Sequence, residues 1–173
     1  MDDEKYSELN YSTPISKLIS DDFVVQDEYW TTHLTVQDAL THRTGLPGHL
    51  LAYDGMRNIS TPKDLVRGIR NLGLSREPRT EFQYCNLMYV VLCHVIETVT
   101  KLWLGDFFKE RIWGPLGMGS TYFHVEDVVK SKKVLARGYR FNAASGDFVP
   151  VDWNPISGDG AGGIFSNVVD YAK

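Results

Sequence analysis

A tyrosine and an asparagine two positions apart, Tyr84 and Asn86, are the residues of this chain best suited to chemistry. They stand at the mouth of a long apolar run, residues 87–99, where packing alone would not require polar groups. A phenol can give or take a proton, and a carboxamide offers both an acceptor and donors. Such a pair suits two parts of a serine acyl-transfer site. No recognisable nucleophilic serine accompanies it, so the sequence indicates half of a mechanism.

Hydrophobic periodicity predicts that a buried helix supports this pair. Residues 86–101 are apolar around most of the helical circumference, which is typical of a central core helix. An earlier helix is expected to begin at Thr35, which can form a capping box with Asp38, and to end at Gly45. Ser60 is expected to cap the next helix. The segment before these helices, to about Trp30, is acidic and is expected to be loop-like, with one short turn of helix that begins at Pro14.

The second half changes its pattern. A further helix is expected over 104–113, before a Gly-Pro pair that ends it. From 134 to 153 the period shifts towards two, on either side of a turn at 144–147, which predicts a β-hairpin. A glycine-rich loop, 158–163, then leads to a last helix that opens near Asn167.

Composition and charge restrict the class of protein. The 173 residues are 43% apolar, 12% aromatic and 23% charged, which fits one globular domain. The net charge of -4 argues against a nucleic-acid partner, because a phosphate-binding surface needs many clustered cations. One basic cluster is expected to be a solvated stretch leading into a strand: Lys130, Lys132, Lys133, Arg137 and Arg140.

No cofactor or metal site is expected. Cys85 and Cys93 would lie about 12 Å apart on one helix, too far for a disulfide. Two unpaired thiols and the lack of a signal peptide favour a cytoplasmic location, and no apolar run reaches the ~20 residues of a membrane span. The histidines form no HExxH motif, and the glycines form no phosphate-binding GxxxxGK[ST] motif.

Four segments, in order, resemble one family, the serine β-lactamase-related and penicillin-binding-protein-like hydrolases of the class C and esterase type. FQYCNLMY contains that family's YxN motif as Tyr84 and Asn86. The other three segments resemble its "LLtHtSGLp", "PLGM" and "GGl.St" blocks. They are LTVQDALTHRTGLP at 34–47, RIWGPLGMGST at 111–121 and GAGGIFS at 160–166.

The resemblance implies an α/β fold, β-lactamase/transpeptidase-like, of which this chain would carry mostly the helical subdomain plus a β-hairpin. It implies catalytic roles for Tyr84, as general acid or base, and for Asn86, which would orient a lysine and the substrate carbonyl. Members act on a small ester, amide or β-lactam through an acyl-enzyme. Cys85 stands where the family commonly has serine and is expected to be a packing residue.

Two other family motifs are missing, the SxxK that carries the nucleophile and a KTG or HxG strand. Ser60 and Lys63 fit SxxK, but Ser60 lies only 24 positions before Tyr84 and after the block at 34–47, which is not the family's order. We therefore interpret residues 1–173 as a partial domain that lacks the nucleophile segment and the C-terminal strands. As an isolated chain it is expected to be inactive.

Two other interpretations stay open. The chain could be a non-catalytic binding or interaction domain derived from the same fold. A cysteine enzyme using Cys85 is disfavoured, because the sequence places no histidine near it. His42 and Arg43 follow a predicted helix, where the helix dipole stabilises cations, and are interpreted as structural.

Overall fold

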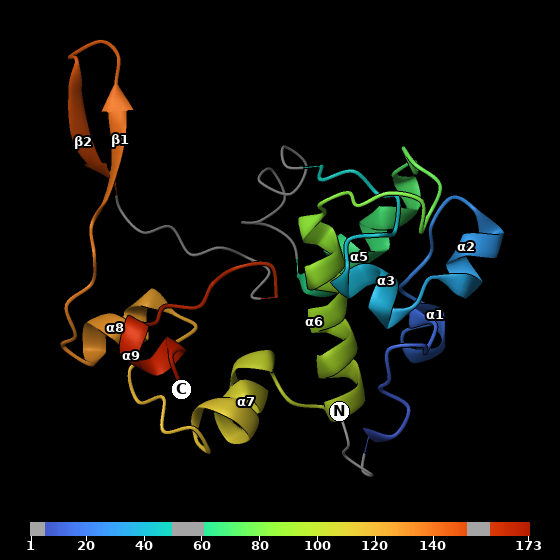
Figure 1. Ribbon diagram of the computed structural model, residues 1–173, viewed down its shortest axis with the longest axis horizontal. Coiled ribbons are helices and arrows are strands. Elements are labelled where there is room, and N and C mark those ends of the chain that lie inside the picture. The colour runs from blue at the N-terminus through green and yellow to red at the C-terminus, as the bar shows by residue number, and fades with distance from the viewer. Residues whose placement is uncertain (1–5, 50–60, 152–159) are drawn as a thin grey trace.

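The computed structural model describes residues 6–49, 61–151 and 160–173. Its central element is α6, Asn86–Thr100, which the other helices of the first half surround (Figure 1). Its buried side chains are mostly aliphatic, and Lys101 ends it in the left-handed conformation with φ +59°. The predicted central helix is thus confirmed to within one residue.

Helices from the first half of the chain pack their apolar sides on α6. They are α1 (Ile15–Leu18), α3 (Val36–Leu40) and α5 (Pro62–Gly68), the last followed by the short turn η2 (Ile69–Asn71), while α2 (Glu28–His33) packs on α1. Full burial of each large aliphatic or aromatic side chain stabilises the fold by about 1.5–3 kcal/mol. The fully buried members include Ile15, Phe23, Leu34, Leu46, Ile69 and Met88.

A second, smaller core lies beyond the end of α6. The chain bends there by 78° into α7 (Leu104–Phe108) and a π-helical turn, η3 (Lys109–Trp113). Leu104, Trp113, Phe123 and Cys93 form this core. The helix predicted over 104–113 is therefore present as two parts. Within the described residues, no helix is long and apolar enough by itself to span a membrane; α6 and α7–η3 meet that criterion only as a bent pair.

The remaining elements follow the π turn. Helix α8 (Val125–Lys130) leads to the antiparallel hairpin β1 (Gly138–Asn142) and β2 (Asp147–Val151). The turn occupies residues 143–146, one position earlier than predicted. The last helix, α9 (Val168–Tyr171), begins next to Asn167, where a helix was predicted to open, and the Asn167 side chain caps it.

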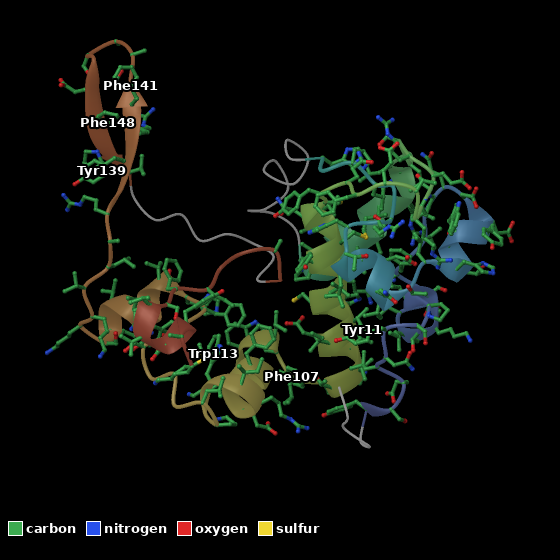
Figure 2. The ribbon with its side chains drawn as sticks, in the orientation of Figure 1. Tyr11, Phe107, Trp113, Tyr139, Phe141 and Phe148 are labelled. Atoms are coloured by element: carbon green, nitrogen blue, oxygen red, sulfur yellow. The ribbon has the colours of Figure 1, made fainter. Side chains whose placement is uncertain are left out.

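The hairpin extends away from the helical body (Figure 2). Phe141 pairs with Phe148, and their rings meet edge to face at 5.5 Å. Tyr139 lies on the same face as these two rings, because side chains two positions apart on a strand share a face. All three rings are more than half exposed, so the hairpin packs on itself and not on the core. Within residues 6–49, 61–151 and 160–173, the fold confirms the prediction of a mostly helical chain with a β-hairpin.

Two expected helix boundaries are wrong. Helix α3 ends at Leu40 instead of continuing to Gly45, because the next backbone groups bond to a distant segment, residues 75–83. Helix α5 is capped by Thr61, not by Ser60: the Thr61 hydroxyl accepts from the Asp64 N–H at 3.2 Å, and the Asp64 carboxylate accepts from the Thr61 N–H at 3.0 Å. Ser60 itself lies outside the described residues.

We predict that Thr61→Ala lowers the free energy of unfolding by about 1 kcal/mol, the usual cost of losing an N-cap. Urea denaturation followed by circular dichroism measures it. Ser60→Ala is the matched control and is expected to change stability by less than about 0.5 kcal/mol. A larger loss for the serine variant than for the threonine variant would contradict the assignment of the cap.

Candidate active site

The predicted pair meets at the start of α6. The Tyr84 hydroxyl donates a hydrogen bond to Asn86 Oδ1 at 2.7 Å. Tyr84 is 55% exposed in the loop before the helix. Asn86 is the first residue of α6 and not its N-cap, a position that Cys85 occupies without a side-chain cap bond. Asn86 therefore does not cap the helix, and its amide oxygen accepts from Tyr84.

The tyrosine borders a cavity of about 490 Å³. One wall comes from the first half of the chain and α6, one from α7, and one from the glycine-rich loop. The lining residues are His42, Tyr84, Tyr89, Leu104, Phe108, Gly160, Ala161, Gly162, Gly163, Ile164 and Tyr171. Three of the four segments that resemble family blocks meet at this cavity. They are 82–89, 160–166 and, through His42, 34–47.

The glycine-rich loop reaches this cavity because Gly160 packs directly on α6. A Cβ at this position would lie 2.3 Å from the Tyr89 carbonyl oxygen and 2.6 Å from Cys93 Cβ. Only a residue without a side chain permits so close an approach. The loop therefore forms a wall of the cavity.

The far end of this loop is held by a buried carboxylate. Asp170 Oδ2 accepts from the Ser120 N–H at 2.6 Å and from the Thr121 hydroxyl at 3.1 Å. Burial alone would raise the pKa of the Asp170 carboxyl, but these hydrogen bonds and Lys173 outweigh it and lower the pKa. A backbone bridge between Tyr122 and Phe165 adds a second attachment. Figure 1 shows this last part of the chain crossing between α9 and α6.

His42 lies under the tyrosine. Its ring centroid is 4.5 Å from that of Tyr84 and 5.2 Å from that of Tyr89, with which it stacks. It is 9% exposed, and burial lowers the pKa of its imidazole. Local sequence pattern does not place His42 beside Tyr84, because 42 positions separate the two residues. The signal that could have found it is the match of its segment to a family block.

Cys85 is a packing residue, as predicted. It is fully buried, and its thiol donates to the Pro47 carbonyl oxygen at 3.3 Å. Burial raises the pKa of the thiol, which opposes formation of a nucleophilic thiolate. A histidine does lie beside it, contrary to the expectation from sequence, but His42 Nδ1 accepts from the Cys85 backbone N–H at 3.2 Å.

The loop that carries Tyr84 is fastened to the segment after α3. The N–H groups of Ser75, Arg79 and Gln83 donate to the carbonyl oxygens of Gly45, Arg43 and His42 at 3.0, 2.8 and 2.8 Å, respectively. The Arg43 guanidinium also donates back to the Arg79 carbonyl oxygen. Arg43 is thus structural, as interpreted from the sequence.

A fork of hydrogen bonds adds to this attachment. Arg79 donates through Nε and Nη2 to the Asp38 carboxylate at 3.0 and 2.8 Å, and its guanidinium lies 5.5 Å from the centroid of the Trp30 ring. The loop before Tyr84 therefore has fixed backbone positions on both sides of Arg79.

No group of three or more His, Cys, Asp or Glu residues in the described part of the chain could hold a metal ion. The cavity is lined by the phenol of Tyr84, and the carboxamide of Asn86 accepts a hydrogen bond from that phenol; a phenol and a carboxamide are groups suited to proton transfer and carbonyl recognition.

A family model described as Beta-lactamase matches residues 1–173. The chain belongs to this family, and the helices and hairpin are part of its β-lactamase/transpeptidase-like fold. An unguisins hydrolase, ungD', of Aspergillus campestris (strain IBT 28561) is 44% identical over 177 residues, which cover 99% of this chain and 33% of that protein.

Solved structures agree. An octameric penicillin-binding protein homologue from Pyrococcus abyssi matches with a TM-score of 0.78 and 29% identity, over 97% of this chain and 39% of that one. A D-amino acid amidase from Ochrobactrum anthropi SV3, complexed with D-phenylalanine, matches with a TM-score of 0.70 and 28% identity, over 94% of this chain and 47% of that one. Among relatives matched by sequence, the chain spans about one third of the length of the two unguisins hydrolases, 33% of one and 31% of the other.

Proposed function

We propose that this chain supplies the proton-transferring and carbonyl-orienting side of a serine hydrolase or acyltransferase site, which acts on an ester or amide through an acyl-enzyme. The observation that carries the proposal is the 2.7 Å hydrogen bond between Tyr84 and Asn86 at the edge of a cavity, in a chain of the Beta-lactamase family. The names of the relatives, a hydrolase and an amidase, support it.

The chemistry follows from the groups. A serine hydroxyl attacks the substrate carbonyl carbon, and its proton passes to the Tyr84 oxygen as the new C–O bond forms. The tyrosine then returns that proton to the departing alcohol or amine, and water later releases the acyl group by the same route. A free phenol titrates near about 10, so Tyr84 needs nearby cations to accept a proton at neutral pH.

Ser60 and Lys63 do not suit the roles of nucleophile and cation. Lys63 Nζ lies 3.7 Å from Asp22 Oδ2, which also contacts His94 Nε2 at 2.9 Å. His94 is eight residues along α6 from Asn86, about 12 Å at the rise of a helix. The Lys63 ammonium is therefore engaged beside the middle of α6, away from Tyr84 and Asn86, and we propose that the site takes its serine and lysine from outside residues 1–173.

The cavity also favours a substrate with an apolar group. Leu104, Phe108 and Ile164 line it beside the tyrosine, and its volume of about 490 Å³ suits a ligand of small-molecule size. We propose an amino-acid or short peptide derivative as the acyl donor, in keeping with the amidase that shares this fold. No nucleic acid is expected to bind, because the net charge is -4.

Acylation of the protein tests the proposal. The purified chain is incubated with a fluorophosphonate and with p-nitrophenyl esters of D- and L-phenylalanine, and its intact mass is measured. We expect no adduct on the 173 residues alone. An adduct that Ser60→Ala abolishes would overturn the assignment of the serine to another segment.

The positive arm uses a longer product of the same coding sequence that contains an SxxK serine. It is expected to become acylated on that serine. Tyr84→Phe should lower the acylation rate about 100-fold or more, the usual contribution of general acid–base catalysis. Tyr122→Phe is the matched control, because that tyrosine lies outside the cavity. Absence of acylation, or an unchanged rate in the Tyr84 variant, would favour the non-catalytic binding domain.

A further inference from the structure

One residue, His42, accepts hydrogen bonds from the backbone N–H groups of the residues before and after Tyr84. The His42 carbonyl oxygen accepts from the Gln83 N–H at 2.8 Å, and His42 Nδ1 accepts from the Cys85 N–H at 3.2 Å. The backbone is therefore fixed immediately before and immediately after the tyrosine. The second of these bonds comes from the residue that separates Tyr84 from Asn86.

The bond from Cys85 specifies the form of the imidazole. A ring nitrogen that accepts an N–H carries no proton of its own, so Nδ1 is unprotonated and the neutral ring carries its proton on Nε2. Burial acts in the same direction, since it lowers the pKa of His42. A protonated ring would be a donor at both nitrogens and would lose the bond to Cys85.

The ring also supports the phenol itself. His42 lies between aromatic side chains, with centroids 4.5 Å from Tyr84, 5.2 Å from Tyr89 and 5.5 Å from Phe82. The Tyr89 hydroxyl donates to the Leu40 carbonyl oxygen at 3.1 Å, which holds that neighbour in place. The imidazole is thus packed where it restricts the tilt of the Tyr84 ring.

His42 adopts a left-handed backbone conformation, which is uncommon for residues other than glycine. Its φ is +55°, in the left-handed region, where a non-glycine residue costs about 1 kcal/mol or more. Glycine or asparagine would adopt it more easily. The strained conformation turns the carbonyl and the ring of His42 towards the same stretch of chain, residues 83–85.

We propose that His42 is a positioning residue for Tyr84, a neutral imidazole that fixes the backbone and the ring plane of the tyrosine. The proposal rests on the role given to Tyr84 above and deepens it. It assigns His42 no contact with the substrate. It explains why a polar, strained histidine lies beneath the phenol where an apolar side chain could have packed.

Two substitutions of similar polarity separate this role from simple packing. His42→Asn places a carboxamide oxygen near the position of Nδ1, and asparagine tolerates a positive φ. His42→Gln carries its amide one carbon further out, near the position of Nε2, and loses the acceptor for Cys85. Both variants keep the main-chain carbonyl that accepts from Gln83, so the Gln83 amide is an internal control for folding.

Amide hydrogen exchange and NMR of the 173-residue chain give the readouts. In H42Q, exchange of the Cys85 amide should accelerate about fivefold or more, the effect of losing one hydrogen bond, while the Gln83 amide stays protected. The nuclear Overhauser contacts between the Tyr84 and Asn86 side chains should weaken. In H42N the Cys85 amide should stay within about twofold of the parent chain, because one hydrogen bond replaces another. The ¹⁵N shifts of His42 should show an unprotonated Nδ1.

Three results would overturn the proposal: an unchanged Cys85 amide in H42Q, unchanged Tyr84–Asn86 contacts in that variant, or a protonated Nδ1. If H42Q also loses Gln83 protection, that variant has unfolded locally, and H42N decides. Retained Tyr84–Asn86 contacts in H42N support the proposal, and lost contacts overturn it. None of these readouts involves turnover, so they report on His42 even if the acylation experiment fails. In a longer, active product, H42Q should lower kcat about tenfold at unchanged KM, and H42N should recover most of that loss.

Discussion

Replacing Gly45 with alanine is expected to destabilise the chain by about 3 kcal/mol or more. Gly45 has a φ of +74°, which L residues rarely adopt, and a Cβ built there would lie 2.2 Å from the Arg76 carbonyl oxygen. The neighbouring group is backbone, so it cannot rotate away as a side chain could. The Gly45 carbonyl also accepts from the Ser75 N–H at 3.0 Å, so any shift breaks the attachment of the loop that carries Tyr84. Urea denaturation measures the loss.

Two other glycines separate the cost of a positive φ from the cost of the steric clash in the Gly45 variant. Gly117 also has a positive φ, +66°, but a Cβ there would meet only the end of the Lys173 side chain at 3.9 Å. Gly117→Ala should therefore cost about 1 kcal/mol, the conformational part alone. Gly119 has open space around it, and Gly119→Ala should be within about 0.5 kcal/mol of the parent chain. Equal stability of the Gly45 and Gly119 variants would show that the close contact with Arg76 is absent.

Gly45 shows which parts of this fold the sequence could predict. The capping box of Thr35 and Asp38 and the central helix α6 depend on residues within a few positions, and both were predicted. The end of α3 and the role of Gly45 depend on a contact 31 positions away. From its neighbours in sequence alone, Gly45 was predicted to be the residue that ends the preceding helix. Helix α2 was missed for a different reason: it has only six residues and no buried side chain, so it has no apolar stripe to read.

The residues of the candidate site likewise fall into those that local sequence pattern predicts and those that only the fold brings together. Tyr84 and Asn86 were predicted together, and their spacing lets the phenol reach the carboxamide directly. His42 and the wall formed by Gly160 reach the same cavity from opposite parts of the chain. Nothing in the periodicity around either residue reports that meeting. Only the order of the matched family blocks indicated that these segments belong to one site.

The second large effect is expected at Asp38, whose replacement by alanine should cost about 2 kcal/mol. Its carboxylate accepts from the Thr35 N–H and hydroxyl at 2.9 and 2.8 Å and from the Arg79 fork. The Asp38 side chain is 9% exposed and that of Arg79 is 46% exposed, so water compensates part of the loss and the cost stays below that of a fully buried pair. Thermal and urea denaturation measure it.

Asp38 also predicts how stability depends on pH. Burial alone would raise the pKa of its carboxyl, but the hydrogen bonds from Arg79 and Thr35 outweigh burial and lower the pKa below 3.8. A carboxyl with a lower pKa in the folded state stabilises the fold at pH values above its unfolded pKa, and this stabilisation is lost as the pH falls through the folded pKa. The stability difference between the parent chain and Asp38→Asn should therefore be constant near neutrality and shrink below about pH 4.

An exposed ion pair on the same loop is the matched control. Arg76 Nε lies 3.2 Å from Glu81 Oε2, with both side chains more than half exposed, so Glu81→Gln should change stability by less than about 0.5 kcal/mol. Asp38→Ala should also release the Arg79 side chain. The backbone N–H of Arg79 donates to the carbonyl oxygen of Arg43, the residue after His42. Faster exchange of the Gln83 and Cys85 amides in this variant would show that the salt bridge holds the tyrosine loop. Normal exchange at both amides, with the stability loss intact, would confine the effect of Asp38 to the cap of α3.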